Sequence, residues 1–338
     1  MSSRIESDLQ WKKRKIWKPK STPTLQQLCR AVIIKSTGLQ RLRRARKDLP
    51  LPRNLIDFVT SGFSFHEFEE ESLDLSRDMQ VHCLYPSRSL LDDSKVLLKC
   101  VNVKSRNSMS VSRLLEKWTE INHKNIMRVL LWFKEQETVG IVLEPFPKSL
   151  YELVEDYRKT DVKVSEWLLW KIIHQVCDAL LYLQRRQIVH AEIESKKLSL
   201  TNTGDVLLHN ILIYTPSETE MNVCVDAEHS FYGIYVAPER IRGQRYSPKH
   251  DSWSLGCVAY ELAYLEPAFP LRPRNNVFEA LNNIVNGVPP PRLADADFYS
   301  PDIVNLIVSC LMPEPRLRPT IKDVFHFTKE RLNSTRLR

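Results

Sequence analysis

The residues that could take part in chemistry lie at three places in the sequence. Lys99 is the only charge in an apolar run, V-L-L-K-C-V, which is typical of a buried strand. Glu192, Glu194 and Lys197 lie close together, and Asn210 follows further along. A carboxylate can accept a proton and a lysine can contact a phosphate. Lys197 would repel a cation, and an amide is a poorer magnesium ligand than a carboxylate. These residue types offer a proton acceptor and a phosphate contact, and they predict no metal site.

Seven cysteines are scattered along the chain, and none forms a C-x-x-C pair. Their number is odd, and Cys100 and Cys257 lie in apolar runs. This pattern indicates buried thiols in a reducing compartment rather than a disulfide framework or a zinc site. The segment 11–20 is too charged for a signal peptide, and no apolar run is long enough to cross a bilayer.

The elements that must position these residues change in type along the chain. With 43% hydrophobic and 27% charged residues, the composition is that of a globular protein and excludes a disordered or collagen-like chain. Strand-like runs come first, and longer helical periods follow, which together predict an α+β fold. The strands are expected at 79–85, 96–103 and 139–143, and the helices at 167–183, 251–264 and 301–311.

Six short motifs occur in a fixed order within residues 73–330. They are V-L-L-K ending at Lys99, H-K-N-I from His123, V-H-A-E ending at Glu192, A-P-E ending at Glu239, D-S-W-S-L-G from Asp251, and R-P-T from Arg318. In this order they resemble the landmarks of a protein kinase domain, which implies a bilobal fold. The resemblance also implies structural roles for three residues. Glu239 pairs with Arg318, and Asp251 braces the catalytic loop.

The parts that carry kinase chemistry differ from the family pattern. No glycine occurs between Gly62 and Gly140, so a glycine-rich phosphate cradle is not expected. Glu192 stands at the position of the general-base aspartate, and Glu194 at that of a lysine. Lys197 and Asn210 replace two magnesium ligands. The resemblance therefore predicts a pseudokinase, which is not an enzyme and needs no cofactor. Of the catalytic parts it leaves Lys99, as a nucleotide contact at most.

Ahead of this domain, the segment 24–33 has the pattern of a short amphipathic helix. Thr22 can cap it, Pro23 suits its first turn and Gly38 can end it. Its apolar positions follow the helical spacing i, i+3, i+4, i+7, i+8. They are Leu25, Leu28, Cys29, Val32 and Ile33. The pattern alone is also compatible with a helix that packs on its own domain.

A second motif follows this helix, L-P-L-P-R-N-L-I-D-F-V at 49–59. The two motifs together resemble a SOCS box, in which a first helix binds elongin C and an L-P-Φ-P turn meets cullin-5. The family places this box C-terminally, whereas here it precedes the other domain. The resemblance implies that Leu25 fills a pocket of elongin C. The residues expected to bind partners are the five helix residues with Leu49, Pro50, Leu51, Pro52, Leu55 and Phe58.

The basic charge is concentrated near the N-terminus, where residues 1–60 hold 15 of the 49 Lys and Arg but only 4 of the 41 Asp and Glu. We expect a basic N-terminus at 1–20, a SOCS box at 21–60, a linker at 61–72, a kinase-like domain at 73–330 and a basic tail at 331–338. A basic arm can serve nucleic acid, an acidic partner or nuclear import, and we do not expect nucleic acid or a membrane to be the partner.

These features predict a function without chemistry. The protein is expected to be the substrate-recognition subunit of an elongin B/C–cullin-5 ubiquitin ligase, whose kinase-like domain holds an unidentified target inside the cell, in cytoplasm or nucleus. An alternative is a pseudokinase scaffold or allosteric regulator of another kinase. A further alternative is an active kinase with displaced catalytic groups.

Overall fold

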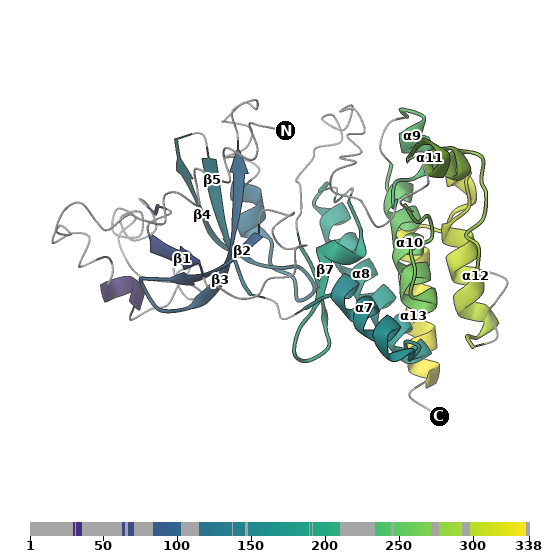
Figure 1. Ribbon diagram of the computed structural model, residues 1–338, viewed down its shortest axis with the longest axis horizontal. Helices are drawn as coiled ribbons and strands as arrows, with labels where there is room; N and C mark the ends of the chain where they lie inside the picture. Colours follow the sequence, from purple (N-terminus) through teal and green to yellow (C-terminus); the bar gives the residue numbers. More distant parts are fainter. Residues whose placement is uncertain are drawn as a thin grey trace. The chain divides into compact units, whose positions relative to one another are not determined.

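Figure 1 shows a computed structural model of the chain. The structure describes residues 30, 32–35, 63–64, 67–70, 84–102, 115–136, 138–145, 148–188, 190, 192–209, 234–244, 247–271, 277–292 and 298–335. The chain divides into two compact units. The sheet unit is Met1–Ser112 with Val129–Pro145, and the helical unit is Arg113–Arg128 with Phe146–Arg338.

The sheet unit is built on five antiparallel strands in the order β1-β2-β3-β5-β4. Their bounds are β1 Phe68–Glu70, β2 Leu84–Ser89, β3 Lys95–Asn102, β4 Val129–Glu135 and β5 Thr138–Leu143. The ring of Phe133 lies directly against Gly140 of the neighbouring strand, where a Cβ would collide with it. Gly140 is therefore required for this close approach.

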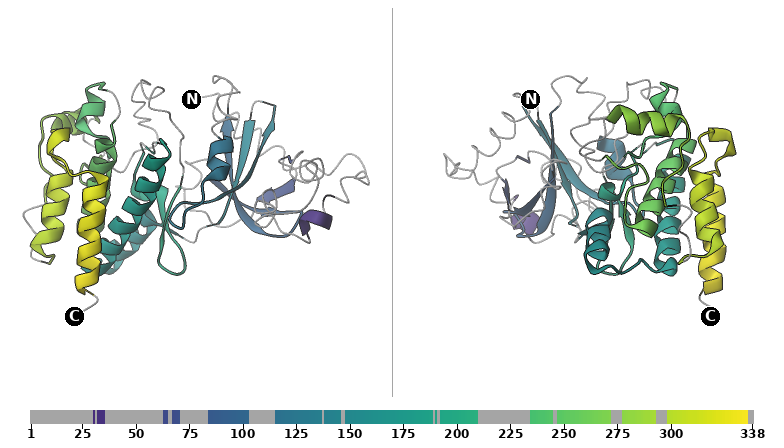
Figure 2. Two further views of the ribbon diagram at one scale, coloured as in Figure 1. Left: turned by 180° about the vertical axis from the view of Figure 1, so that it is seen from behind. Right: turned by 45° about the vertical axis from the view of Figure 1, so that its right-hand side comes forward.

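One face of this sheet carries a continuous apolar core. Val96, Leu98 and Val142 come from the central strands, and the rings of Phe68 and Phe133 stack with centroids 5.8 Å apart. Residues 30 and 32–35, which are helical, lie beside β1 in both Figure 1 and Figure 2. We call them the docked helix, because its Ile34 belongs to the same core.

The helical unit contains most of the remaining elements. Its helices are α7 Leu150–Thr160, α8 Glu166–Arg185, α9 Pro238–Ile241, α10 Lys249–Tyr264, α11 Val277–Val285, α12 Pro301–Cys310 and α13 Ile321–Thr335. The unit also contains two 3-10 turns, η3 Ser195–Lys197 and η4 Pro315–Leu317. A small antiparallel sheet completes it, with strands β6 Lys148–Ser149, β7 Leu198–Leu200 and β8 Val206–Leu208. Residues 115–120 form a further helical segment.

Two helices organise this unit. Helix α8 begins where the Ser165 hydroxyl accepts a hydrogen bond from the Leu168 amide, and its buried residues recur at helical spacing. Helix α10 is buried at every position from His250 to Tyr264. A helix that is buried all round lies at the centre of its unit, and α8 and α12 pack against it.

The predicted α+β class and the order of strands before helices are confirmed. The three predicted helices correspond to α8, α10 and α12, and two of the predicted strands to β3 and β5. Of the strand expected at 79–85, only its last two residues are described, and they begin β2. Strand β4 was not predicted. Within the described part of the chain, no helix has the length and apolarity needed to span a bilayer.

Candidate functional site

Lys99 lies in the central strand β3, paired with Leu84 of β2 and Ile141 of β5. Its residue exposure is 9%, and its neighbour Leu98 is fully buried. Strand β3 forms because its apolar residues fit a sheet covered on both faces. The structure therefore holds the Lys99 ammonium in the sheet unit, whereas Glu192, Glu194 and Lys197 belong to the helical unit.

His190 fixes the loop that carries the acidic residues. The backbone N–H of Glu192 donates to Nδ1 of His190 at 3.4 Å, so the proton of the neutral ring is on Nε2. Nε2 then donates to the carbonyl oxygen of His209 at 3.1 Å. The amide of His209 in turn donates to the Lys197 carbonyl. This chain of hydrogen bonds sets the direction in which Glu192 and Lys197 project.

Lys197 lies between two carboxylates at the end of η3. Its ammonium is 2.6 Å from Glu192 and 3.1 Å from Glu194, and its side chain is only 11% exposed. Burial lowers the pKa of Lys197, but the carboxylates of Glu194 and Glu192 outweigh it and hold the pKa above its usual value. The lysine is therefore a permanent cation at this site.

A second polar cluster lies at Glu261 in the buried helix α10. Its carboxylate accepts hydrogen bonds from the Ser195 hydroxyl at 2.9 Å and from the Tyr235 hydroxyl at 2.6 Å. Burial raises the pKa of Glu261 to about 7, against the opposing effect of the two donors. The sequence prediction missed this cluster. The available signal was a single acid in the otherwise apolar stretch of α10.

The structure brings Glu239 and Arg318 together. The guanidinium donates to both carboxylate oxygens, at 2.7 and 2.6 Å, and both side chains are buried. Its remaining N–H groups donate to the carbonyl oxygens of Met312, Pro313 and Lys249. This pair links α9 to the chain after α12. Asp251 is also buried, in the first turn of α10.

Most of the predicted partner-binding residues lie outside the described part of the chain. Of that set, the structure describes Val32 and Ile33. Val32 is 67% exposed, whereas Ile33 is half-buried and packs against the sheet core. The others are Leu25, Leu28, Cys29, Leu49, Pro50, Leu51, Pro52, Leu55 and Phe58. The predicted Asn210 also lies outside the described residues.

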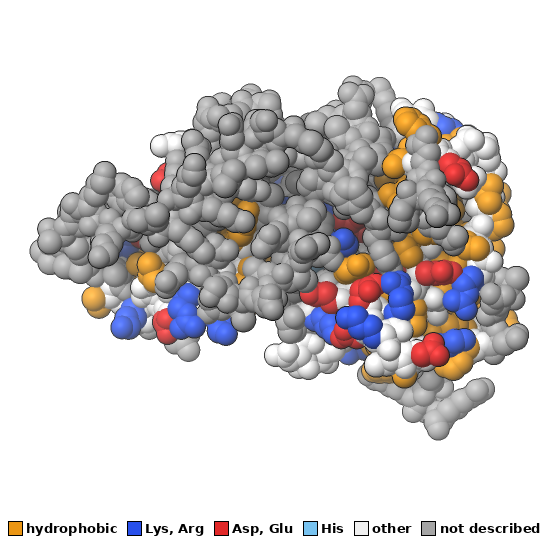
Figure 3. Space-filling model, in the orientation of Figure 1, with side chains coloured by type: hydrophobic (Ala, Val, Ile, Leu, Met, Phe, Trp, Pro, Cys, Tyr) orange, Lys and Arg blue, Asp and Glu red, His pale blue; other side chains and the backbone are white. Residues whose placement is uncertain are grey.

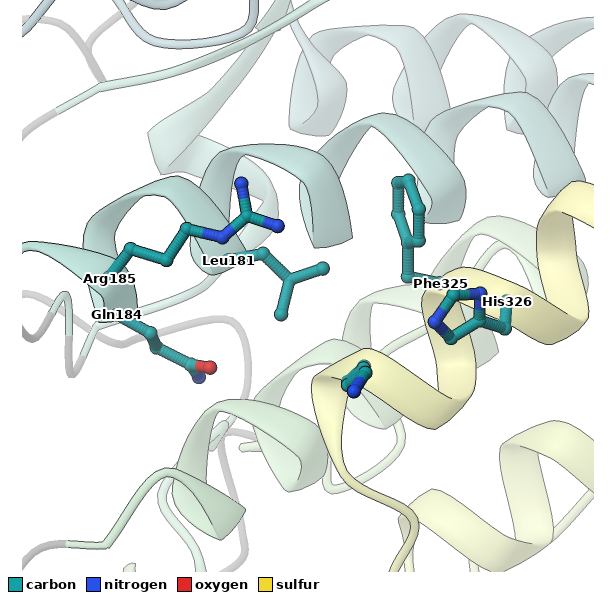
Figure 4. A pocket seen from close by; sticks show the side chains of 6 residues that line it. Leu181, Gln184, Arg185, Phe325 and His326 are labelled. Carbon is teal, nitrogen blue, oxygen red and sulfur yellow. The ribbon is translucent and has the colours of Figure 1, made fainter.

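An open pocket of about 450 Å³ lies between α8 and α13 (Figure 4). Leu181 and Phe325 give it apolar walls, and Gln184, Arg185, Lys322 and His326 also line it. None of the predicted site residues lines this pocket. On the face drawn in Figure 3, acidic and basic side chains are interspersed over the coloured part of the helical unit. That face therefore has no single-sign patch among its described side chains.

The kinase resemblance implies a magnesium ion. No group of three or more His, Cys, Asp or Glu residues within the described ranges could hold a metal ion. The ammonium of Lys197 lies 2.6 Å from the carboxylate of Glu192 and 3.1 Å from that of Glu194, so it competes with a metal ion for both groups. With this ammonium in place, the two carboxylates are poorly suited to hold magnesium.

Comparison with known families gives two matches along the chain. A family model described as "Protein kinase domain" matches residues 84–328, which is most of the sequence. This chain belongs to the protein kinase family. A second family model, described as "SOCS box", matches residues 21–60. The predicted pairing of a SOCS box with a kinase-like fold is therefore confirmed.

The kinase domain resembles several named kinases. An Aurora kinase of Schizosaccharomyces pombe is 26% identical over 233 residues, covering 68% of this chain and 61% of that protein. Serine/threonine-protein kinase Nek10 of Homo sapiens is 27% identical over 259 residues, covering 72% of this chain and 21% of Nek10. Mitogen-activated protein kinase kinase 2 of Arabidopsis thaliana is 32% identical over 201 residues, covering 57% of this chain and 52% of that protein. This chain thus spans less than two thirds of each relative.

The prediction that the kinase domain is not an enzyme is wrong. The relatives that match over this domain are named as protein kinases, among them serine/threonine kinases. The prediction rested on the missing glycine-rich loop and on the residues at the positions of two aspartates, Glu192 and Asn210. The comparison nevertheless places the domain among proteins named as kinases.

Proposed function

We propose that this protein kinase recruits a target protein to a ubiquitin ligase built on elongins B and C and cullin-5. The observation that carries the proposal is the presence of a SOCS box at 21–60 and a protein kinase domain at 84–328 in one chain. In this arrangement the SOCS box binds the adaptor, and the kinase domain binds the target. The complex would act in the cytoplasm or the nucleus.

The proposed function needs two binding events and no chemistry by the SOCS box. A helix that inserts apolar side chains into a groove is a common mode of recognition. Fully burying one leucine contributes about 1.5–3 kcal/mol, so Leu25 is expected to be a main contributor. Holding the target on the same chain raises its effective concentration near the ubiquitin-carrying enzyme.

The test is capture of purified elongin B/C by the full-length chain. We expect wild type to bind and Leu25→Ala to lose most of the binding. Cys29→Phe should act in the same way, because the larger ring prevents close approach of the helix. Leu317→Ala is the matched control, since Leu317 is 63% exposed and lies in the helical unit. Absence of binding by the wild type would refute the proposal.

A second candidate function is phosphoryl transfer, which the names of the relatives favour. The hydroxyl oxygen of a target would attack the terminal phosphorus of ATP, the bond to the bridging oxygen would break and ADP would leave. In the helical unit, the hydroxyl proton would pass to the carboxylate of Glu192. In the sheet unit, taken by itself, Lys99 stands where the kinase resemblance expects a phosphate-contacting lysine.

This second candidate has its own test. Transfer of labelled phosphate from ATP to a generic protein substrate should fall in both Lys99→Ala and Glu192→Gln. Lys95→Ala is the control, because Lys95 lies in the same strand and is exposed. A wild-type chain without transfer, or full activity in Lys99→Ala, would reject this function.

A further inference from the structure

The docked helix is fixed to the kinase sheet by a charged contact. Nη1 of Arg30 lies 3.2 Å from Oε1 of Glu67, and the guanidinium lies 4.2 Å from the centroid of the Phe63 ring. Oε2 of Glu67 also accepts a hydrogen bond from the Ser64 amide. These partners all come from the segment just before β1, so the helix contacts the sheet unit at one defined place.

This contact is buried enough to fix one orientation. The side chain of Arg30 is 9% exposed and that of Glu67 is 20% exposed. Burial lowers the pKa of Arg30 and raises that of Glu67, and the attraction between the two opposes both effects. Separating the pair would leave a poorly solvated charge on each side, which is costly. The arginine therefore specifies the register of the helix on the sheet.

An apolar contact lies on the same side of the helix. Ile34 follows Arg30 by four residues, one turn of helix, and is fully buried in the sheet core. Val32 lies two residues from each, and about 100° of rotation per residue turns it to the opposite side. Its 67% exposure agrees with that position. The docked helix therefore has an inner face that is covered and an outer face that is open.

The outer face carries Val32, one of the five helix residues that the sequence predicts to bind elongin C. The sequence pattern predicts that Leu25, Leu28 and Cys29 share one helical stripe with Val32, and these three residues lie outside the described part of the chain. The family model of the SOCS box covers the whole of this segment. Ile33 lies between the two faces and is already half-buried against the sheet. It contributes less to an outside partner than its place in the motif suggests.

We infer that the docked helix joins the kinase sheet to the ligase adaptor through opposite faces. Arg30 and Ile34 hold the SOCS box on the sheet, while the face with Val32 contacts elongin C. The inference rests on the proposed function and adds that the adaptor binds without release of the helix from the sheet. The sheet unit would then be held in a fixed orientation to the adaptor, rather than on a flexible tether.

The first arm of the test measures affinity of the full chain for purified elongin B/C. We expect Val32→Asp to weaken binding at least about tenfold without lowering the melting temperature. Val162→Asp is the matched control, because Val162 is 52% exposed in the helical unit. The double variant Arg30→Met/Glu67→Gln removes both charges together. It should change the affinity by less than about threefold.

The second arm follows amide hydrogen exchange at 63–70 with and without elongin B/C. Protection there should persist in the complex, because the inner face stays on the sheet. If wild type binds but protection is lost, or Val32→Asp binds normally, the two-face inference is overturned while the proposed function stands. If wild type does not bind elongin B/C, the proposed function fails and the inference falls with it.

Discussion

The ammonium of Lys197 lies 2.6 Å from the carboxylate of Glu192 and 3.1 Å from that of Glu194. One lysine therefore pairs with two acids in the loop that begins at His190. The loop is held from behind by the hydrogen bond from His190 to the carbonyl oxygen of His209. The charges of Glu192 and Glu194 are therefore compensated in part by a side chain of the same loop.

Removal of this ammonium should destabilise the helical unit. In Lys197→Met, Glu192 and Glu194 face each other without compensation. Breaking a buried ion pair by removal of one partner costs about 3–5 kcal/mol, and we expect the low end because Glu192 is 35% exposed. Urea unfolding at pH 7 measures the loss. Lys159→Met, at an exposed position of α7, is the control. An unchanged midpoint would contradict the role given to Lys197.

The pair of Glu239 and Arg318 predicts a larger loss. Both side chains are buried, and five hydrogen bonds of the guanidinium end on oxygen atoms around it. Arg318→Met should lower the free energy of unfolding by about 3–5 kcal/mol, because Glu239 is left as a buried charge. Thermal and urea unfolding would measure the change. Arg316→Met, two residues away and exposed, should stay within about 0.5 kcal/mol of wild type.

This pair is a case in which the sequence was sufficient. Glu239 and Arg318 are 79 residues apart, yet the ordered kinase motifs predict their contact. Helices α8 and α10 were also predictable, because apolar residues recur at helical spacing over many turns. Such signals are local or belong to a known family pattern, and neither depends on details of packing.

Other features depend on contacts that no local pattern encodes. The apolar stripe of the first helix does not include Ile34, but the structure buries Ile34 fully in the sheet core. The contacts that hold this face come from Phe63 and Glu67, which lie 33 and 37 residues after their partner Arg30. Strand β4 was missed because its burial pattern is not a strict alternation. Glu261 was missed because its partners Ser195 and Tyr235 are distant in the sequence.

Histidine burial predicts a loss of stability in acid. Burial lowers the pKa of His250 to about 4, although nearby Glu239 partly opposes the shift. In the unfolded chain the pKa of this histidine is near 6.5. Between pH 6.5 and pH 4, His250 is therefore protonated in the unfolded state but neutral in the folded state. The free energy of unfolding should therefore fall by about 2 kcal/mol from pH 7 to pH 5 through this residue alone.

The variant His250→Asn isolates this contribution. Asparagine does not titrate, and its amide can contact the backbone of Ser247, which the imidazole Nδ1 contacts at 2.8 Å. Urea unfolding at pH 7 and pH 5 should give a smaller difference for the variant than for wild type. His326→Asn serves as the control, because His326 lies at the pocket between α8 and α13. The prediction would be contradicted if the free energy of unfolding changed by the same amount between pH 7 and pH 5 in wild type and in His250→Asn.

Glu261 should change the free energy of unfolding with pH in the direction opposite to His250. Burial raises its pKa to about 7 in the folded chain, above the 4.5 of an ordinary glutamate. Between these values the folded state holds more protons than the unfolded state, so the free energy of unfolding falls as the pH rises. From pH 5 to pH 8 the loss should be about 2 kcal/mol, which is close in size to the gain from His250 over the same range.

Glu261→Gln removes this loss while retaining both hydrogen-bond partners, because the hydroxyls of Ser195 and Tyr235 can each donate or accept. The variant should match wild type at pH 5 and exceed its free energy of unfolding by about 2 kcal/mol at pH 8. Glu279→Gln, exposed on α11, should change neither value. A variant less stable than wild type at pH 8 would mean that Tyr235 and Ser195 require the ionised carboxylate. The ionised carboxylate of Glu261 would then stabilise α10 rather than destabilise it.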